Sequence, residues 1–277
     1  MGNKKAVKVL IAAHKPYPVP DDRAYVPVFV GAECHSEKLD DMVVRGFTPD
    51  NTGENISSKN PSFCELTGVY WGWKNIDADF IGMAHYRRYF GDPSLKKEAS
   101  PYERIISADR LEELLEKKSV IVPKKRKYYI ETLYSHYAHT HYALHLDETR
   151  NIIADKYPEY LKTFDKVMKQ RSGYMFNMQI MSKELNDAYC EWLFDILFEL
   201  ERRLGEMDYD FFQGRFYGRV SEIIFNVWLT QQIKDGVIKK RQIAELPCIY
   251  TEKINWWKKG TAFLSAKLFH KKYKGSF

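Results

Sequence analysis

The feature that most constrains the fold of this chain is the alternation of short apolar runs with segments of helical periodicity. Residues 7–13 (VKVLIAA) form an apolar run of the kind found in strands buried on both faces of a sheet. Similar strands are predicted at residues 26–32, 80–84, 120–123, 174–181 and 242–249. Helices are predicted between them, at residues 61–75, 107–118, 129–169, 185–204 and 221–233. The alternation predicts an α/β fold with a mainly parallel sheet flanked by helices on both faces.

Length and composition favour one domain with a short appendage. The 277 residues are 44% hydrophobic and 29% charged, which suffices to bury a core. We expect a domain over residues 1–252 and a basic, aromatic tail over residues 253–277. The four cysteines are dispersed without a C-x-x-C pair, which argues against a zinc ribbon and for a reducing compartment. Because no segment resembles a signal peptide or a membrane span, we expect a cytoplasmic protein.

Polar segments follow three of the predicted strands, after Ala13, Ala84 and Pro123. Ligands of open α/β sheets bind beyond the carboxyl ends of strands, so function is expected to collect in these segments. After the first strand, His14 and Lys15 have three interpretations: a nucleotide contact, a substrate contact or a plain strand exit. The sequence contains neither a Rossmann fingerprint nor a P-loop.

Residues 50–60 (DNTGENISSKN) carry many hydrogen-bonding groups directly before a predicted helix. A helix N-terminus with Asn55, Ser57, Lys59 and Asn60 nearby is suited to an anion. The alternative is an ordinary turn in which Asn60 caps the helix. Composition alone does not separate the two.

The segment HYRRY, residues 85–89, is the most informative in the chain. Two adjacent arginines at a strand end are costly to bury without an anionic partner, and arginine binds phosphate oxygens in a bidentate fork. If the strand continued, Arg87 and Arg88 would face opposite sides of the sheet. In that case only one of them would touch the ligand, and the other could hold a structural carboxylate. We expect at least one of them to bind a ligand phosphate.

Metal ligands are weakly indicated. Residues 77–79 (DAD) and 208–210 (DYD) are the D-x-D triplets of the chain, and such pairs hold Mg²⁺ or Mn²⁺ in many sugar-nucleotide enzymes. The first triplet precedes its strand, however, whereas a metal-binding pair follows one. Four histidines in residues 136–145 (HYAHTHYALH) lack an H-E-x-x-H pattern, so a polar pocket wall is favoured over a zinc site. We assign no metal ligand and leave Mg²⁺ or Mn²⁺ open as a cofactor.

Glu222 follows the aromatic and basic stretch 211–219 (FFQGRFYGR), at the expected start of a helix. A carboxylate at that position acts either as a general base toward a sugar hydroxyl or as a favourable charge for the helix dipole. Taken by itself, the pattern favours the dipole.

Four motifs together resemble a known family: NISSKN at residues 55–60, CELT at 64–67, YWGWKN at 70–75 and HYRRYF at 85–90. Shorter likenesses include His14-Lys15, Asn177-Met178 and RVSE at 219–222. These motifs occur in the same order as in a known family, over about residues 8–250. Through them the chain resembles the capsular and exopolysaccharide biosynthesis proteins long described as a domain of unknown function.

The resemblance implies a glycosyltransferase (a hexosyltransferase) with a nucleotide-binding α/β domain of the GT-A type. It implies a nucleotide-sugar donor and a saccharide acceptor, and for some relatives UDP-galactofuranose and inversion. HYR stands where a GT-A enzyme places its D-x-D, so arginine would replace the metal at the diphosphate.

The expected site residues fall into three groups. Donor binding is assigned to His14, Lys15, Asn55, Ser57, Lys59, Asn60, His85, Arg87 and Arg88. Acceptor binding is assigned to Tyr137, His141 and Asn177. The resemblance places Glu222 in a recurring R-x-S-E segment, which makes it the first candidate for the catalytic base, and Glu65 is the second.

The net charge of +6 fits an anionic partner. From Lys253 to Lys274 the tail has seven lysines and no acid, interleaved with Trp, Phe and Leu. Such a segment suits the surface of an anionic membrane, which is where a lipid-linked acceptor would be found. The alternative is that its aromatic residues pack onto the domain.

A second class of function, a non-catalytic polysaccharide-binding assembly protein, fits the clustered aromatic and basic residues equally well. Nucleic acid is not expected as a partner, since the charge excess is modest and no RNA- or DNA-reading motif is present.

Overall fold

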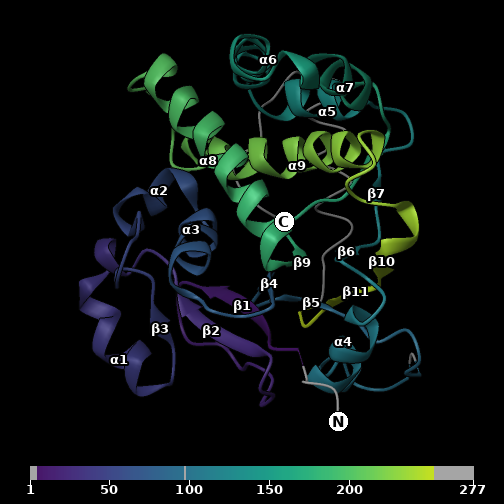
Figure 1. Ribbon diagram of the computed structural model, residues 1–277. Helices are drawn as coiled ribbons and strands as arrows, with labels where there is room; N and C mark the ends of the chain where they lie inside the picture. The colour runs from purple at the N-terminus through teal and green to yellow at the C-terminus, as the bar shows by residue number, and fades with distance from the viewer. Residues whose placement is uncertain (1–4, 97, 253–277) are drawn as a thin grey trace.

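The structure is a computed structural model that describes residues 5–96 and 98–252 (Figure 1). Its helices are α1 (Leu39–Val44), α2 (Asn60–Phe63), α3 (Leu66–Asn75), α4 (Ala108–Leu115), α5 (Leu133–Thr140), α6 (Leu144–Lys156), α7 (Pro158–Met168), α8 (Lys183–Leu204) and α9 (Phe216–Lys234). Its strands are β1 (Val7–Ala13), β2 (Tyr25–Phe29), β3 (Thr48–Pro49), β4 (Phe80–His85), β5 (Arg88–Phe90), β6 (Val120–Pro123), β7 (Arg126–Lys127), β8 (Ser172–Gly173), β9 (Gln179–Ser182), β10 (Ile243–Leu246) and β11 (Cys248–Tyr250).

A central sheet runs in the order β10-β6-β9-β4-β1-β2-β3. β4, β1, β2 and β3 are parallel neighbours, and β10 is parallel to β6. β9 runs antiparallel to both β4 and β6, so β6 points the same way as β4. The carboxyl ends of β1, β2, β4 and β6 therefore meet at one edge of the sheet. The predicted α/β architecture with a mainly parallel sheet is confirmed.

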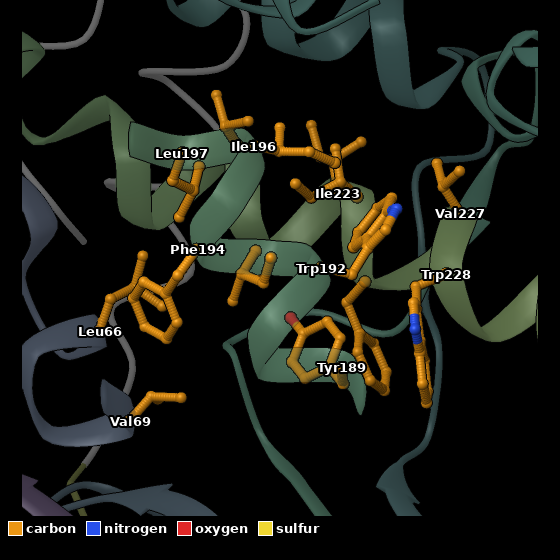
Figure 2. Packing of buried hydrophobic residues seen from close by; sticks show 14 of the residues in the cluster. Leu66, Val69, Tyr189, Trp192, Phe194, Ile196, Leu197, Ile223, Val227 and Trp228 are labelled. Carbon is orange, nitrogen blue, oxygen red and sulfur yellow. The ribbon is translucent and has the colours of Figure 1, made fainter. Parts of the chain in front are cut away.

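The alternation of side chains along β1 divides the core into two layers. Leu10 and Ala12 belong to the apolar cluster covered by α3, α8 and α9, whereas Val9 and Ile11 belong to the cluster closed by α4. Figure 2 shows how the apolar side chains of α3, α8 and α9 interdigitate in the larger layer. Each such side chain contributes about 1.5 to 3 kcal/mol when fully buried. The two apolar layers therefore hold the central strands, and with them the polar loops at their carboxyl ends, in a fixed position. Among the described helices, none is long and apolar enough to cross a membrane.

Two predicted elements are interrupted by left-handed backbone. The helix expected at residues 61–75 is broken between α2 and α3, because Cys64 has φ 55° and ψ −130°. Asn60, expected as a cap, is instead the first residue of α2, and its Nδ2 donates to the Cys64 carbonyl at 2.8 Å. The strand expected at residues 174–181 is reduced to β9, because Phe176 (φ 77°) and Asn177 (φ 49°) cannot continue a ladder.

Two other boundaries move. The helix expected at residues 221–233 begins already at Phe216, so Glu222 lies inside α9 and not at its start. The interpretation of Glu222 as a charge at a helix N-terminus is therefore wrong. The strand expected at 242–249 is divided into β10 and β11 at Pro247, which has no N–H to donate to a ladder.

Gly82 of β4 lies where the sheet leaves no room for a side chain. A Cβ at this position would lie 2.5 Å from Ile180 Cγ1 and 2.7 Å from the Gln179 carbonyl oxygen, both on β9. We expect Gly82→Ala to lower the free energy of unfolding by about 1 to 3 kcal/mol, because the backbone of β9 has to move. Gly214→Ala is the matched control, since nothing lies within 4 Å of its added Cβ. Urea denaturation measures both variants, and equal losses would contradict the prediction.

Candidate active site

A cleft of about 1120 Å³ opens at the carboxyl edge of the sheet. Its lining includes His14 after β1, Val30 after β2, residues 85–88 after β4, and Arg126 with Lys127 after β6. Residues of α5 and α9 form the facing wall. The polar segments after β1, β4 and β6, in which function was expected to collect, thus lie together in this cleft.

The structure divides the expected donor residues into two sets. Six of them line the cleft: His14, Lys15, Asn60, His85, Arg87 and Arg88. The other three do not, and their polar groups serve the protein itself. Ser57 is fully buried and its hydroxyl donates to the Asp50 carboxylate, while Asn55 Oδ1 accepts from the Ser57 N–H at 3.1 Å. Lys59 Nζ forms an ion pair with Glu201 at 2.8 Å. Asn55, Ser57 and Lys59 thus form the turn that was the alternative interpretation of this loop.

HYRRY forms a tight hairpin and not a continuing strand. β4 ends at His85 and β5 begins at Arg88, and these two residues pair. Both arginines consequently line the cleft, and the condition under which they would face opposite sides, a strand that continues past His85, is not met. Arg87 Nη1 forms an ion pair with Glu252 at 3.1 Å. The Arg88 guanidinium lies 4.6 Å from the centroid of the Phe176 ring, and its buried Nε has no hydrogen-bond partner among the described residues.

Two further arginines of the cleft, Arg215 and Arg219, were not predicted as site residues. Arg215 Nε donates to Cys64 Sγ at 3.0 Å. The Arg219 guanidinium lies 4.1 Å from the centroid of the Phe212 ring, and its buried Nη1 has no hydrogen-bond partner within the part of the chain that the structure describes. The sequence did hold an indication, because the two arginines stand four residues apart in the FFQGRFYGR stretch and helical spacing brings such residues to one face.

Two carboxylates lie among these cations, Glu222 on α9 and Glu65 directly before α3. Burial raises the pKa of Glu222 to about 7, and the neighbouring charge of Glu65 raises it as well. A hydrogen bond from the Phe176 backbone N–H and the charges of Arg88 and Arg126 oppose this rise. A carboxyl group with a pKa near neutrality, placed in a cleft, is suited to general acid–base catalysis.

The left-handed residues Phe176 and Asn177 hold both carboxylates in place. Phe176 donates its N–H to Glu222, and its carbonyl accepts from His85 Nε2. Asn177 Nδ2 donates to Glu65 Oε1 at 2.7 Å and to the Gly218 carbonyl at 2.9 Å. Asn177 is buried and is not part of the cleft lining, so it orients Glu65, and the geometry does not support its expected place in the acceptor site.

Tyr137 and His141, the other expected acceptor residues, do line the cleft from α5 and the residue that follows it. Tyr137 Oη shares a hydrogen bond of 2.8 Å with His145 Nδ1, and His141 Nδ1 contacts Gln213 Oε1 at 3.0 Å. Burial lowers the pKa of His141 to about 3, so its ring is neutral at physiological pH. This wall of the cleft is therefore aromatic and uncharged at these two positions.

The histidines and aspartates weighed as metal ligands form hydrogen bonds within the protein. Glu131 contacts His136 Nδ1 at 2.9 Å and His139 Nδ1 at 2.6 Å. Neither D-x-D triplet lines the cleft: Asp79 accepts the N–H of Ala6, and Asp210 accepts that of Gln213. Over residues 5–96 and 98–252 there is no group of three or more His, Cys, Asp or Glu side chains that could hold a metal ion.

Comparison with known proteins adds two findings. The family model described as "Domain of unknown function (DUF4422)" matches residues 8–233. Among solved structures, the apo structure of WbbM, a bifunctional glycosyltransferase, is similar with a TM-score of 0.80 and 28% sequence identity. That likeness covers 90% of this chain and 46% of the WbbM chain, so this chain spans about half the length of its relative. No curated protein sequence matches. The fold is GT-A-like, as the sequence analysis predicted.

The raised pKa of Glu222 makes a prediction about stability. Because its folded-state pKa of about 7 exceeds the ordinary value of 4.5, the proton on Glu222 stabilises the fold fully below about pH 4.5. This contribution is lost as the pH rises through 7, where a buried charge forms. At a pH of about 8.5, roughly 1.5 units above that pKa, Glu222→Gln should therefore have a higher Tm than the wild type. Its free energy of unfolding should be higher by about 1 to 3 kcal/mol. The difference should shrink toward pH 5 (roughly the ordinary carboxyl range).

Differential scanning calorimetry across this pH range measures the effect. Glu116→Gln is the control, since Glu116 is an exposed carboxylate at the end of α4. A difference between Glu222→Gln and wild type that does not change with pH would contradict the assignment.

Proposed function

The chain belongs to the DUF4422 family, and on that premise we propose that it is a glycosyltransferase that moves a sugar from a nucleotide-activated donor to a saccharide acceptor. The observation that carries this proposal is the pairing of Glu222 and Glu65 with a group of arginines in one cleft at the carboxyl edge of the sheet. The similarity to WbbM supports the class of reaction, since WbbM is described as a bifunctional glycosyltransferase.

The arginines supply the site for the donor diphosphate. Arg88 and Arg219 each have a buried N–H group without a hydrogen-bond partner in the described chain, and an unsatisfied buried donor costs about 1 to 3 kcal/mol. Phosphate oxygens would satisfy these groups with charge-assisted hydrogen bonds. His14, Lys15 and Arg87 lie in the same cleft, and Tyr17 stacks on Tyr86 beside them with ring centroids 4.0 Å apart. We propose a UDP-sugar as the donor, on the strength of the family motifs.

GT-A enzymes commonly hold Mg²⁺ or Mn²⁺ at the diphosphate through carboxylates. The residues here do not fit such an ion: HYRR occupies the strand end where the acidic pair would stand, and both D-x-D triplets lie outside the cleft. The contacts to the donor diphosphate are therefore assigned to side chains of the cleft and not to a metal ion.

Glu222 is the proposed catalytic base of an inverting transfer. Its carboxylate takes the proton of an acceptor hydroxyl as the hydroxyl oxygen attacks the anomeric carbon. The bond from that carbon to the diphosphate oxygen breaks, and the nucleoside diphosphate leaves with its charge stabilised by the arginines. Glu65, held by Asn177, adds a like charge that raises the pKa of Glu222. Tyr137 and His141, which line the same cleft, are the proposed acceptor contacts.

The biological setting stays a prediction from the family motifs: capsular or extracellular polysaccharide synthesis, with a lipid-linked acceptor at the inner face of the cell membrane and UDP-galactofuranose as one candidate donor. The basic tail at residues 253–277, expected to contact that membrane, lies outside the described residues. The division into a transferase domain at 1–252 and this tail is likewise proposed.

Donor binding is tested with UDP. We expect UDP to raise the Tm in the presence of EDTA, because the arginines and not a metal contact its phosphates. GDP, CMP and dTDP in the same assay report the base preference. A shift that requires Mg²⁺ or Mn²⁺ would contradict the arginine site and return attention to the aspartates.

Arg88→Ala and Arg219→Ala should each weaken UDP binding by about 1.5 to 3 kcal/mol, because each removes a charge-assisted contact to phosphate. Isothermal titration calorimetry measures the loss. Lys59→Ala is the matched control, since it removes a cation that pairs with Glu201 outside the cleft. Two arginine variants with wild-type affinity would place the diphosphate elsewhere.

Turnover separates an enzyme from a non-catalytic polysaccharide-binding protein. Release of UDP from UDP-sugars in the presence of a lipid-linked acceptor should rise with pH around a midpoint near 7, because Glu222 acts as a base only when deprotonated. Glu222→Gln should lose turnover while it keeps its affinity for UDP. If no nucleotide sugar is turned over although UDP binds, the assembly-protein hypothesis is favoured.

A further inference from the structure

A second feature of the molecule lies at the rim of the cleft. Apart from the charge of Arg126, which acts on Glu222, it takes no part in the proposed chemistry. It is the segment of residues 124–130 (KKRKYYI), which leaves β6, forms β7 and turns before α5; we refer to it as the basic loop. Lys124, Lys125, Arg126 and Lys127 are all exposed. None of the four forms an ion pair with an acidic side chain in the described ranges. Lys125 lies over the Tyr174 ring and Arg126 over the Tyr128 ring, but no carboxylate of the described residues contacts any of the four cations directly.

The basic loop also exposes two large apolar side chains next to these cations. Tyr129 is 76% exposed and Ile130 is 61% exposed. Removing the Ile130 side chain from water would contribute about 1.5 to 3 kcal/mol, so a partner that covers this apolar pair gains binding energy.

The outward position of these side chains is built into the backbone. Tyr129 adopts a left-handed conformation with φ 57°, which a bulky residue avoids unless its surroundings hold it there. Arg171 Nη1 donates to the Tyr129 carbonyl at 3.2 Å, and the Tyr128 N–H donates to the Arg171 carbonyl at 2.8 Å. β7 pairs with β8, which anchors the other end of the turn. The apolar pair is thus presented by a hydrogen-bonded turn.

The basic loop is continuous with the entrance of the cleft. Arg126, Lys127 and Tyr128 belong to the cleft lining, and so does Phe211, which is 77% exposed. A surface that covered Tyr129 and Ile130 would also lie against the cationic residues at the cleft entrance.

We propose that the basic loop docks onto an anionic lipid bilayer, with Tyr129 and Ile130 at headgroup depth and the cations against lipid phosphates. Charge complementarity carries the choice of occupant: a membrane surface offers negative charge over an extended area and an apolar layer directly beneath it. A single phosphate ligand would satisfy the cations but would leave the tyrosine and the isoleucine in water. The proposal concerns residues 124–130 alone and does not depend on the reaction or on the tail.

The test uses the full-length protein and sedimentation with phosphatidylcholine vesicles, with and without phosphatidylglycerol. We expect binding only to the vesicles that contain phosphatidylglycerol. Tyr129→Ser with Ile130→Ser should weaken it at least fivefold, because the apolar contact is lost. The triple variant Lys124→Gln, Lys125→Gln and Lys127→Gln should weaken it by more than tenfold, since one lysine near an anionic surface contributes about fivefold.

A matched control separates the basic loop from net charge. Lys117, Lys118 and Lys239 line a different surface hollow together with Arg241 and Gln242. Changing these three lysines to Gln removes the same charge and should leave vesicle binding near the wild-type level. The Tm of every variant is measured to verify folding.

Three results would overturn the proposal. The wild type could fail to bind the anionic vesicles at low salt. Both lysine triples could weaken binding equally, which would mean that only net charge matters. The basic-loop variants could bind the anionic vesicles like the wild type, which would assign the binding to another part of the chain; a loss of affinity for a single-stranded oligonucleotide in the same variants would then make the loop a nucleic-acid contact.

Discussion

The candidate site depends on two residues of left-handed backbone, Phe176 and Asn177, at the point where the chain enters β9. A non-glycine residue in this conformation costs about 1 to 3 kcal/mol, and it persists only where its surroundings over-determine it. Here the surroundings are the site itself. The Phe176 backbone forms hydrogen bonds with Glu222 and His85. The Asn177 side chain forms hydrogen bonds with Glu65, Gly218 and Ser221. One short segment therefore ties the end of β4, the start of α3 and the first turns of α9 together.

This arrangement explains why charged groups of both signs can share the cleft. Glu65 and Glu222 are like charges held near each other, which is unfavourable when both are ionised. The guanidinium groups of Arg88 and Arg126 lower that cost without removing it. The cations outnumber the carboxylates in the lining, so the cleft as a whole attracts an anion. The carboxyl group of Glu222 nevertheless keeps a pKa of about 7.

The sequence was informative where burial on both faces of a strand produces continuous apolar runs. β1, β4 and β6 were predicted nearly to their ends, and with them the edge at which His14, Arg87 and Arg88 meet. Interruptions at Cys64 and Phe176 were not predicted, because these residue types rarely adopt a positive φ. Asn177 is of a type enriched in this conformation, but one asparagine in an apolar run is a weak signal.

Contacts between side chains far apart in the sequence could not be predicted either. Ser57 and Lys59 have the chemistry of an anion site, but Asp50 and Glu201 use their polar groups. Arg219 was not predicted as a site residue, because the helix was expected to begin two residues after it. In the structure α9 begins before Arg219, and Arg219 lines the cleft.

The ion pair between Arg87 and Glu252 couples the cleft to the segment that follows β11. Glu252 presents a carboxylate to a guanidinium of the cleft, so an anion that binds Arg87 has to compete with it. Competition of this kind is reciprocal: the factor by which Glu252 weakens the anion equals the factor by which the anion weakens the hold on Glu252. Occupancy of the cleft and the hold on Glu252 are thus two readouts of a single equilibrium.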